Sequence, residues 1–127
     1  MNTLSNIFIV GAGSCLGGVV RYLLSRVVQS GLHTAFPWGT LVVNLLGCFV
    51  IGLVYGLIDR GFQLSDSMRL FITVGFCGGF TTFSTFMHEN YLLFTAPNHL
   101  LVALYLLASV TAGFIMVYAA YSIARMF

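Results

Sequence analysis

The chain has 127 residues, of which 59% are hydrophobic and only 6% are charged, and its mean hydropathy is +1.00. About a quarter of the residues of a typical soluble domain are charged, so this composition excludes a soluble globular protein and indicates an integral membrane protein. The formal net charge of +2 comes from scattered side chains, without the basic cluster that nucleic acid or an anionic lipid surface requires.

Apolar runs of about 20 residues, the length that spans a bilayer as a helix, occur four times. They fall at residues 4–24, 39–58, 70–94 and 100–123, which predicts a single all-α transmembrane domain over residues 1–127. Ser65 or Asp66 is suited to cap the third helix, and Asn98 the fourth. The arginines divide three against one or two between the two sides, a bias too small to fix one orientation in the membrane.

The first span contains a glycine-rich segment, Gly11 to Gly17, that resembles a nucleotide-binding turn. We reject that interpretation because the apolar pattern continues to Leu24 and no acidic residue occurs before Asp59. Close helix packing explains these glycines better, and the apolar stretch is too long for a signal peptide. Arg21, near the end of the span, either extends to the lipid head groups or lies at the mouth of an aqueous vestibule.

In the second span, Thr40 and Asn44 are four residues apart and share one helix face. A buried Asn44 amide either forms a hydrogen bond to a neighbouring helix or offers its two N–H donors to a ligand without a net charge.

The third span contains the run Gly78-Gly79-Phe80-Thr81-Thr82-Phe83-Ser84-Thr85-Phe86, which is unusually polar for a membrane helix. The double glycine either permits close packing or breaks the helix near its middle and frees backbone carbonyls. Beyond it, Phe83 and Phe86 are expected on one helix face, with Thr82, Thr85 and Glu89 on a neighbouring face. The two phenylalanines either line a polar path or contact lipid and core.

Tyr105, Ser109 and either Ala112 or Gly113 form a stripe on the fourth helix, where the Ser109 hydroxyl either faces a path or bonds back to its own helix. At membrane depth the chain thus offers N–H and O–H donors and aromatic rings, with Glu89 the one carboxylate within a span and no lysine. Donors and the positive edges of phenyl rings suit a small, strongly hydrated anion. Four helices fill their own centre with side chains, so oligomerisation is expected.

These features carry a family resemblance. Four spans in a short chain, Arg21 after a glycine-rich helix, the motif Gly39-Thr40-Leu41-Val42-Val43-Asn44 and the glycine-phenylalanine-hydroxyl run of the third span together resemble the Fluc (CrcB) fluoride channels. The resemblance implies an antiparallel, dual-topology homodimer with two fluoride pores in the plasma (inner) membrane. It implies passive export of fluoride down its electrochemical gradient, which protects the cell, and no catalysed reaction.

The resemblance also implies roles for particular residues. Phe83 and Phe86 would line the pores, Asn44 would stand at the vestibule end, and Arg21 and Glu89 would lie near the two ends of the path. The backbone carbonyls of Gly78 and Thr81 from both subunits would hold a central structural Na⁺. The polar track would include Thr82, Ser84, Thr85, Tyr105 and Ser109. Some family members have a second serine where this chain has Gly113, so water or a backbone group is expected to substitute there.

Three other functions are possible on the sequence alone. A small proton-coupled exporter of cationic compounds can also be a four-helix, dual-topology dimer. It requires a carboxylate embedded in the membrane, however, and Glu89 lies late in its span. A structural subunit of a larger complex would be inactive by itself. An enzyme is disfavoured because the three histidines, at or near loops, have no partnered nucleophile.

Overall fold

The computed structural model describes residues 2–127, and Met1 lies outside the described residues. Four helical segments are long and apolar enough to cross a membrane, namely Thr3–Ser30, Trp38–Asp59, Asp66–Thr95 and His99–Met126. The four predicted helices are therefore confirmed. Helix α1 (Thr3–Ser30) continues beyond the predicted end at Leu24, because its last turns are polar enough to escape a hydropathy search but still hydrogen-bond as a helix.

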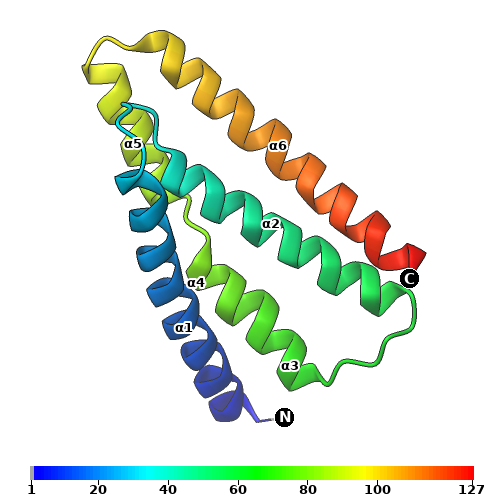
Figure 1. The fold of residues 1–127 in the computed structure, drawn as a ribbon. Helices are drawn as coiled ribbons and strands as arrows, with labels where there is room; N and C mark the ends of the chain where they lie inside the picture. Colours follow the sequence, from blue (N-terminus) through cyan, green and yellow to red (C-terminus); the bar gives the residue numbers. More distant parts are fainter. Residues whose placement is uncertain (1) are drawn as a thin grey trace.

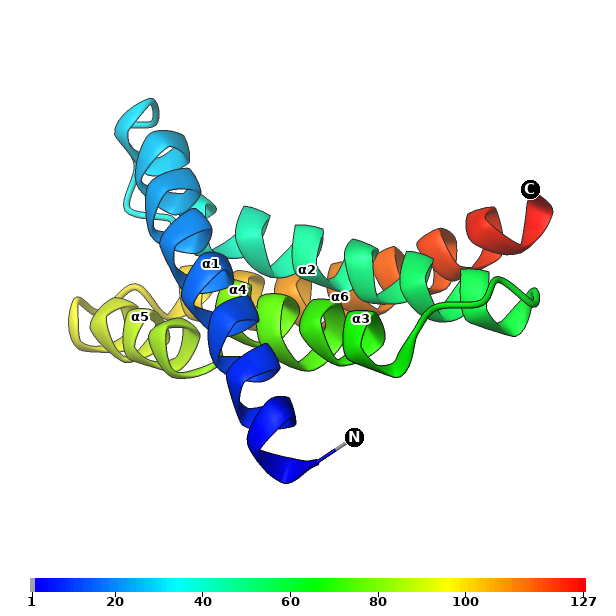
Figure 2. The ribbon, with the colours of Figure 1, turned by 90° about the horizontal axis from the view of Figure 1, so that it is seen from below.

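Helix α2 (Trp38–Asp59) packs along α6 (His99–Met126), and the two run side by side in both views (Figures 1 and 2). Glycines allow the close approach: a Cβ atom on Gly52 would lie 2.9 Å from the Ala120 Cβ, and one on Gly56 would lie 2.8 Å from the Ala124 Cβ. Gly52 and Gly56 thus serve close helix packing within one chain.

Helix α1 crosses the other helices obliquely, as Figure 2 shows, and packs against the first half of the third span. Here too the backbones meet at glycines, since a Cβ atom on Gly75 would lie 3.0 Å from the Cα of Gly13. The Ser14 hydroxyl donates a hydrogen bond of 3.3 Å to the Gly75 carbonyl across this contact.

The third span is not one continuous helix. It consists of α3 (Asp66–Leu70), a π-helical segment η1 (Phe71–Cys77), a short turn α4 (Gly78–Phe80) and α5 (Ser84–Thr95), with non-helical backbone at residues 81–83. Figure 1 shows the interruption between α4 and α5. The predicted break is confirmed, but its position is corrected: Gly78 and Gly79 remain helical, and the chain unwinds at the residues that follow them.

The helix caps agree with the sequence in one case. The Ser65 hydroxyl accepts a hydrogen bond from the Met68 N–H and caps α3, as predicted. Asn98 occupies the position before α6 but makes no side-chain capping bond. The prediction of an Asn98 cap was therefore wrong, since Asn98 has a φ of −107° and a ψ of 58°, outside the extended conformation typical of a capping residue.

The buried core is small and lies where α2, α5 and α6 meet. Its buried hydrophobic residues are Leu41, Phe86, Leu93 and Tyr105, and Phe36 from the loop before α2 packs against them. Many large apolar side chains are exposed instead, as expected for helices that face lipid or a partner. The core thus places the second half of the third span against α2 and α6.

Candidate functional site

The non-helical backbone at residues 81–83 is held by a side chain of α2. The Asn44 Nδ2 donates to the Thr82 carbonyl at 3.1 Å, and the Thr82 N–H donates to the Asn44 Oδ1 at 2.8 Å. The Thr82 hydroxyl in turn accepts from the Thr85 N–H and so caps the start of α5. Of the two predicted roles of Asn44, the hydrogen bond to a neighbouring helix segment is the one present in the structure.

Arg21 of α1 contributes a second support for the break. Its Nε donates a hydrogen bond of 3.1 Å to the carbonyl of Gly79, which the unwinding deprives of its usual helical donor, the N–H four residues later. The side chain is therefore turned towards the third span at this contact. This contact does not favour extension to the head groups, and the position at a vestibule mouth stays a prediction.

Two carbonyls next to the break keep no donor. Because Thr82 donates to Asn44 and residues 81–83 are not helical, no hydrogen bond onto the carbonyls of Gly78 or Thr81 is found within residues 2–127. Gly78 is exposed, and no atom lies within 4 Å of the position of a Cβ on it. Acceptors of this kind at membrane depth require a partner outside the helix.

A cavity of about 460 Å³, here termed the break pocket, lies beside these residues. Phe83 is 73% exposed although it lines this pocket, whereas Phe86 is buried. Their ring centroids are 6.1 Å apart. Both rings line the same pocket, with Phe83 directly before α5 and Phe86 in its first turn. The pocket brings together five of the predicted path residues and the two residues of the predicted Na⁺ site. The path residues are Asn44, Thr82, Phe83, Phe86 and Ser109, and the Na⁺ site residues are Gly78 and Thr81.

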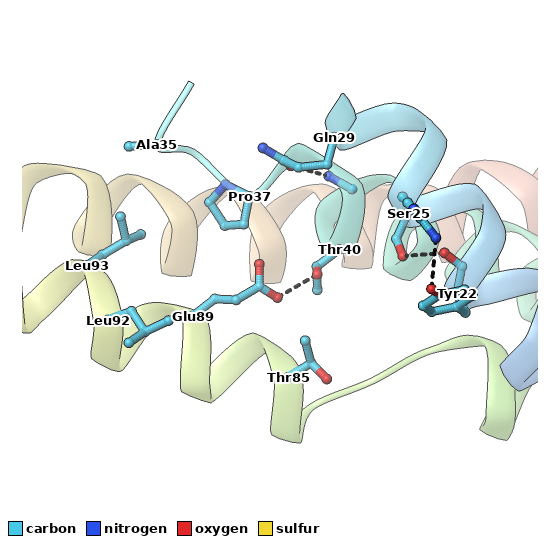
Figure 3. Close-up of a pocket in the computed structure, with 12 residues that line it drawn as sticks. Tyr22, Ser25, Gln29, Ala35, Pro37, Thr40, Thr85, Glu89, Leu92 and Leu93 are labelled. Carbon is cyan, nitrogen blue, oxygen red and sulfur yellow. Dashed lines mark hydrogen bonds between the residues drawn. The ribbon is translucent and has the colours of Figure 1, made fainter. Parts of the chain in front are cut away.

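A second cavity, of about 510 Å³ and here termed the Glu89 pocket, is formed by α1, α2, α5 and the loop before α2. In Figure 3, the Glu89 carboxylate points to Thr40, whose hydroxyl donates a hydrogen bond of 2.5 Å to it. Both side chains lie at the first turn of α2, where the helix dipole favours a negative charge. Thr85 lines this pocket and not the break pocket. Since Thr40 and Asn44 are one turn apart, the two pockets open at successive turns of α2.

Two buried hydroxyls of α6 have no hydrogen-bond partner within the described part of the chain. They are the Tyr105 hydroxyl and the Ser109 hydroxyl, which lie on successive turns. The Tyr105 ring meets Phe86 edge to face, with centroids 4.7 Å apart. Ser109 does not bond back to its own helix, so that predicted alternative was wrong. Ser109 lines the break pocket, whereas Tyr105 lines neither cavity.

The remaining predicted residues lie outside the two cavities. Ser84 is exposed and lines neither cavity, and Arg21 lines neither as well. A Cβ atom on Gly113 would lie 3.5 Å from the Cys48 Sγ, so a side chain and not a backbone group is its nearest neighbour. The sequence did not reveal the pairing of Thr40 with Glu89, because their contact depends on how α5 resumes after the break.

Comparison with known proteins assigns the family. The family model described as "CrcB-like protein, Camphor Resistance (CrcB)" matches residues 8–121. A protein of Azobacteroides pseudotrichonymphae named "Fluoride-specific ion channel FluC" is 43% identical over 110 residues, which cover 87% of this chain and 88% of that protein. Proteins of the same name are 45% identical in Chlorobium chlorochromatii, over 90% and 88% of the two chains, and 38% identical in Chloroflexus aurantiacus, over 98% of each. This chain belongs to the CrcB family.

Proposed function

We propose that this chain is a fluoride-selective passive channel, which conducts F⁻ down its electrochemical gradient and thereby gives resistance to fluoride. The observation that carries the proposal is the break pocket, where the buried and unpartnered Ser109 hydroxyl meets the Asn44 amide and the Phe83 and Phe86 rings. The names of its relatives support the same function. No reaction is catalysed.

Fluoride suits this arrangement because it is small and strongly hydrated and needs donors in place of its water. Tyrosine and serine hydroxyls supply O–H donors without a charge, and the edge of a phenyl ring carries partial positive charge. A buried donor that has no protein partner is costly unless a ligand or water satisfies it. A path lined in this way can pass an anion without binding it as tightly as a lysine would.

The same proposal includes a second copy of this chain. Phe83, which lines the break pocket, is 73% exposed, and Gly78, whose carbonyl accepts no hydrogen bond within residues 2–127, is exposed as well. A lipid tail cannot satisfy a carbonyl, whereas a protein partner, or an ion held between two copies, can. An antiparallel dual-topology homodimer also agrees with the small arginine bias between the two sides.

We further propose that the Gly78 and Thr81 carbonyls bind a structural Na⁺ at the dimer interface. Carbonyl oxygens replace the hydration shell of a monovalent cation, and these two carbonyls accept no hydrogen bond within residues 2–127. The donor set therefore fits the ion. Bound Na⁺ would hold the breaks of two copies together. Purified protein should show a higher unfolding temperature in Na⁺ than in N-methylglucamine, and equal temperatures would contradict the proposal.

A proton-coupled exporter of cationic compounds is less well supported. The Glu89 carboxylate that it would need already accepts a hydrogen bond from Thr40, and Asp59 accepts one of 2.6 Å from Tyr121 at the far end of the α2–α6 pair. No further carboxylate lies within the membrane-spanning segments close to either pocket.

The test is anion efflux from liposomes that contain only this chain, with fluoride and chloride compared in parallel. We expect fluoride to leave rapidly and chloride to stay at the leak rate of empty liposomes. Equal rates for the two anions would overturn the selectivity, and no efflux of either anion would overturn the channel itself. A cross-linking experiment on the same liposomes should give a dimer band.

A further inference from the structure

Helix α2 begins without a capping side chain of its own. The residue before it is Pro37, which makes no side-chain capping bond. Gln29 of the last turn of α1 takes that place: its Oε1 accepts a hydrogen bond of 3.1 Å from the Gly39 N–H, and its Nε2 donates one of 3.3 Å to the Phe36 carbonyl. Figure 3 shows this amide pointing at the start of α2. One half-buried side chain thus joins α1, the loop and α2.

Each of these hydrogen bonds leads to a group of the proposed path. Gly39 precedes Thr40, whose hydroxyl donates to Glu89. The Phe36 ring packs against Tyr105 edge to face, with centroids 5.2 Å apart, and against Trp38 at 4.7 Å. The position of the Gln29 amide is therefore coupled to Thr40 on one side and to Tyr105 on the other.

We propose that Gln29 is a positioning residue of the ion path, an inference that rests on the proposed fluoride conductance. It holds the first turn of α2 so that the Thr40 hydroxyl meets Glu89, and it holds the loop so that Phe36 packs on Tyr105. Without the amide, the Gly39 N–H loses its partner, which favours fraying of a helix start. The Phe36 carbonyl loses one of three donors and still accepts from the Thr34 hydroxyl and the Trp38 N–H. The Glu89 pocket would then lose its defined geometry while the break at residues 81–83, held by Asn44, would stay intact.

The test uses a substitution of similar length. Gln29→Met keeps the apolar volume but removes both hydrogen bonds, whereas Gln29→Glu keeps an acceptor for Gly39 and removes the donor to Phe36. Gln63→Met is the matched control, because Gln63 is exposed in the loop between α2 and α3. Trp38 is the one tryptophan of the chain, and its contact with Phe36 makes its fluorescence a direct report on the loop.

We expect Gln29→Met to shift the Trp38 emission and to lower fluoride efflux about tenfold, and Gln29→Glu to have an intermediate effect on both. Gln63→Met should leave both unchanged. In a Thr40→Val background, Gln29→Met should lower efflux little further, because both changes act on the same contact.

Three results would overturn the proposal. One is an unchanged Trp38 spectrum in Gln29→Met. Another is unchanged efflux in that variant. The third is a loss of efflux on Gln29→Met that is as large in the Thr40→Val background as in the wild-type chain. This result would show that Gln29 supports the fold as a whole and does not act through Thr40. If Gln29→Met does not yield folded protein, Gln29→Glu is read by the same criteria. If the wild-type chain conducts no fluoride but Gln29→Met still shifts the Trp38 emission, the proposed function fails and the structural coupling stands.

Discussion

The side-chain amide of Asn44 pairs with both backbone groups of Thr82, donating to its carbonyl at 3.1 Å and accepting from its N–H at 2.8 Å. The amide thereby replaces, for one residue, the helical hydrogen bonds that the break removes. Because an amide nitrogen carries two N–H groups, the second N–H of Asn44 is still available to the break pocket that this residue lines. A structural role and a donor role are therefore compatible at this position.

Changes at Asn44 should separate these two roles. In Asn44→Asp the carboxylate keeps the acceptor for the Thr82 N–H, loses the donor to the Thr82 carbonyl and adds negative charge beside an anion path. In Asn44→Leu both bonds are lost, which should destabilise the fold by about 1–3 kcal/mol. We expect impaired fluoride efflux in both variants and a lower unfolding temperature chiefly in Asn44→Leu. Full efflux in Asn44→Asp, with the aspartate shown to be ionised, would contradict the donor role.

Replacement of the two phenylalanines should reduce conduction for different reasons. Phe83 is 73% exposed, so Phe83→Ile removes a ring edge from the path at little cost in stability. Phe86 packs on Tyr105, so Phe86→Ile should also loosen the core, by about 1 kcal/mol. Efflux from liposomes should fall strongly in both, while size-exclusion profiles match wild type. Unchanged efflux in both variants would exclude a role of the rings in conduction.

Arg21 should act through the hydrogen bond of its guanidinium to Gly79. Arg21→Met removes this donor next to the break, whereas Arg21→Lys retains a cation that can still donate to a carbonyl. We therefore expect the methionine variant to lose more efflux and more thermal stability than the lysine variant. Equal losses in the two would indicate instead that the geometry of the guanidinium, and not a donor as such, is required.

Two glycines of α1 offer a matched pair for the packing of this helix. A Cβ atom on Gly13 would lie 2.6 Å from the Phe71 carbonyl oxygen and 2.8 Å from the Phe76 nitrogen, whereas one on Gly11 meets no atom within 4 Å. Gly13→Ala should therefore destabilise the fold by about 1–3 kcal/mol. Gly11→Ala should be neutral or stabilise it by up to about 1 kcal/mol, because alanine favours a helix over glycine. Unfolding temperatures in detergent would compare them, and equal values would contradict the contact.

A hydroxyl added at Gly113 tests what the polar track lacks in this chain. The nearest neighbour of a Cβ there is the Cys48 Sγ at 3.5 Å, which is an ordinary contact distance, so Gly113→Ser should fold normally. The new hydroxyl lies one turn beyond Ser109 and extends the row of donors on α6. Fluoride efflux should equal or exceed that of wild type, and a fall in efflux would show that the Gly113 position must stay without a side chain.

The four membrane spans could be predicted from the sequence because transfer of an apolar helix into lipid depends on the residues of that helix alone. The Ser65 cap could be predicted for the same reason, because it depends only on residues next to it in the sequence. The polar run after Gly78 indicated a break and a path, and the residue types indicated an anion. The family follows from the same motifs, and the match over residues 8–121 confirms it.

The exact place of the break depended on the tertiary structure. A double glycine is compatible with a helix or with a break, and the choice is made by Asn44, Arg21 and Thr82, which lie far apart in the sequence and can compensate unwinding only at residues 81–83. The same holds for Gln29, whose partners are Phe36 in the following loop and Gly39 in the first turn of α2. Hydropathy placed the helices in the membrane, and hydrogen bonds between them decided which polar groups remain free for an ion, because in lipid each such group must find its partner within the protein.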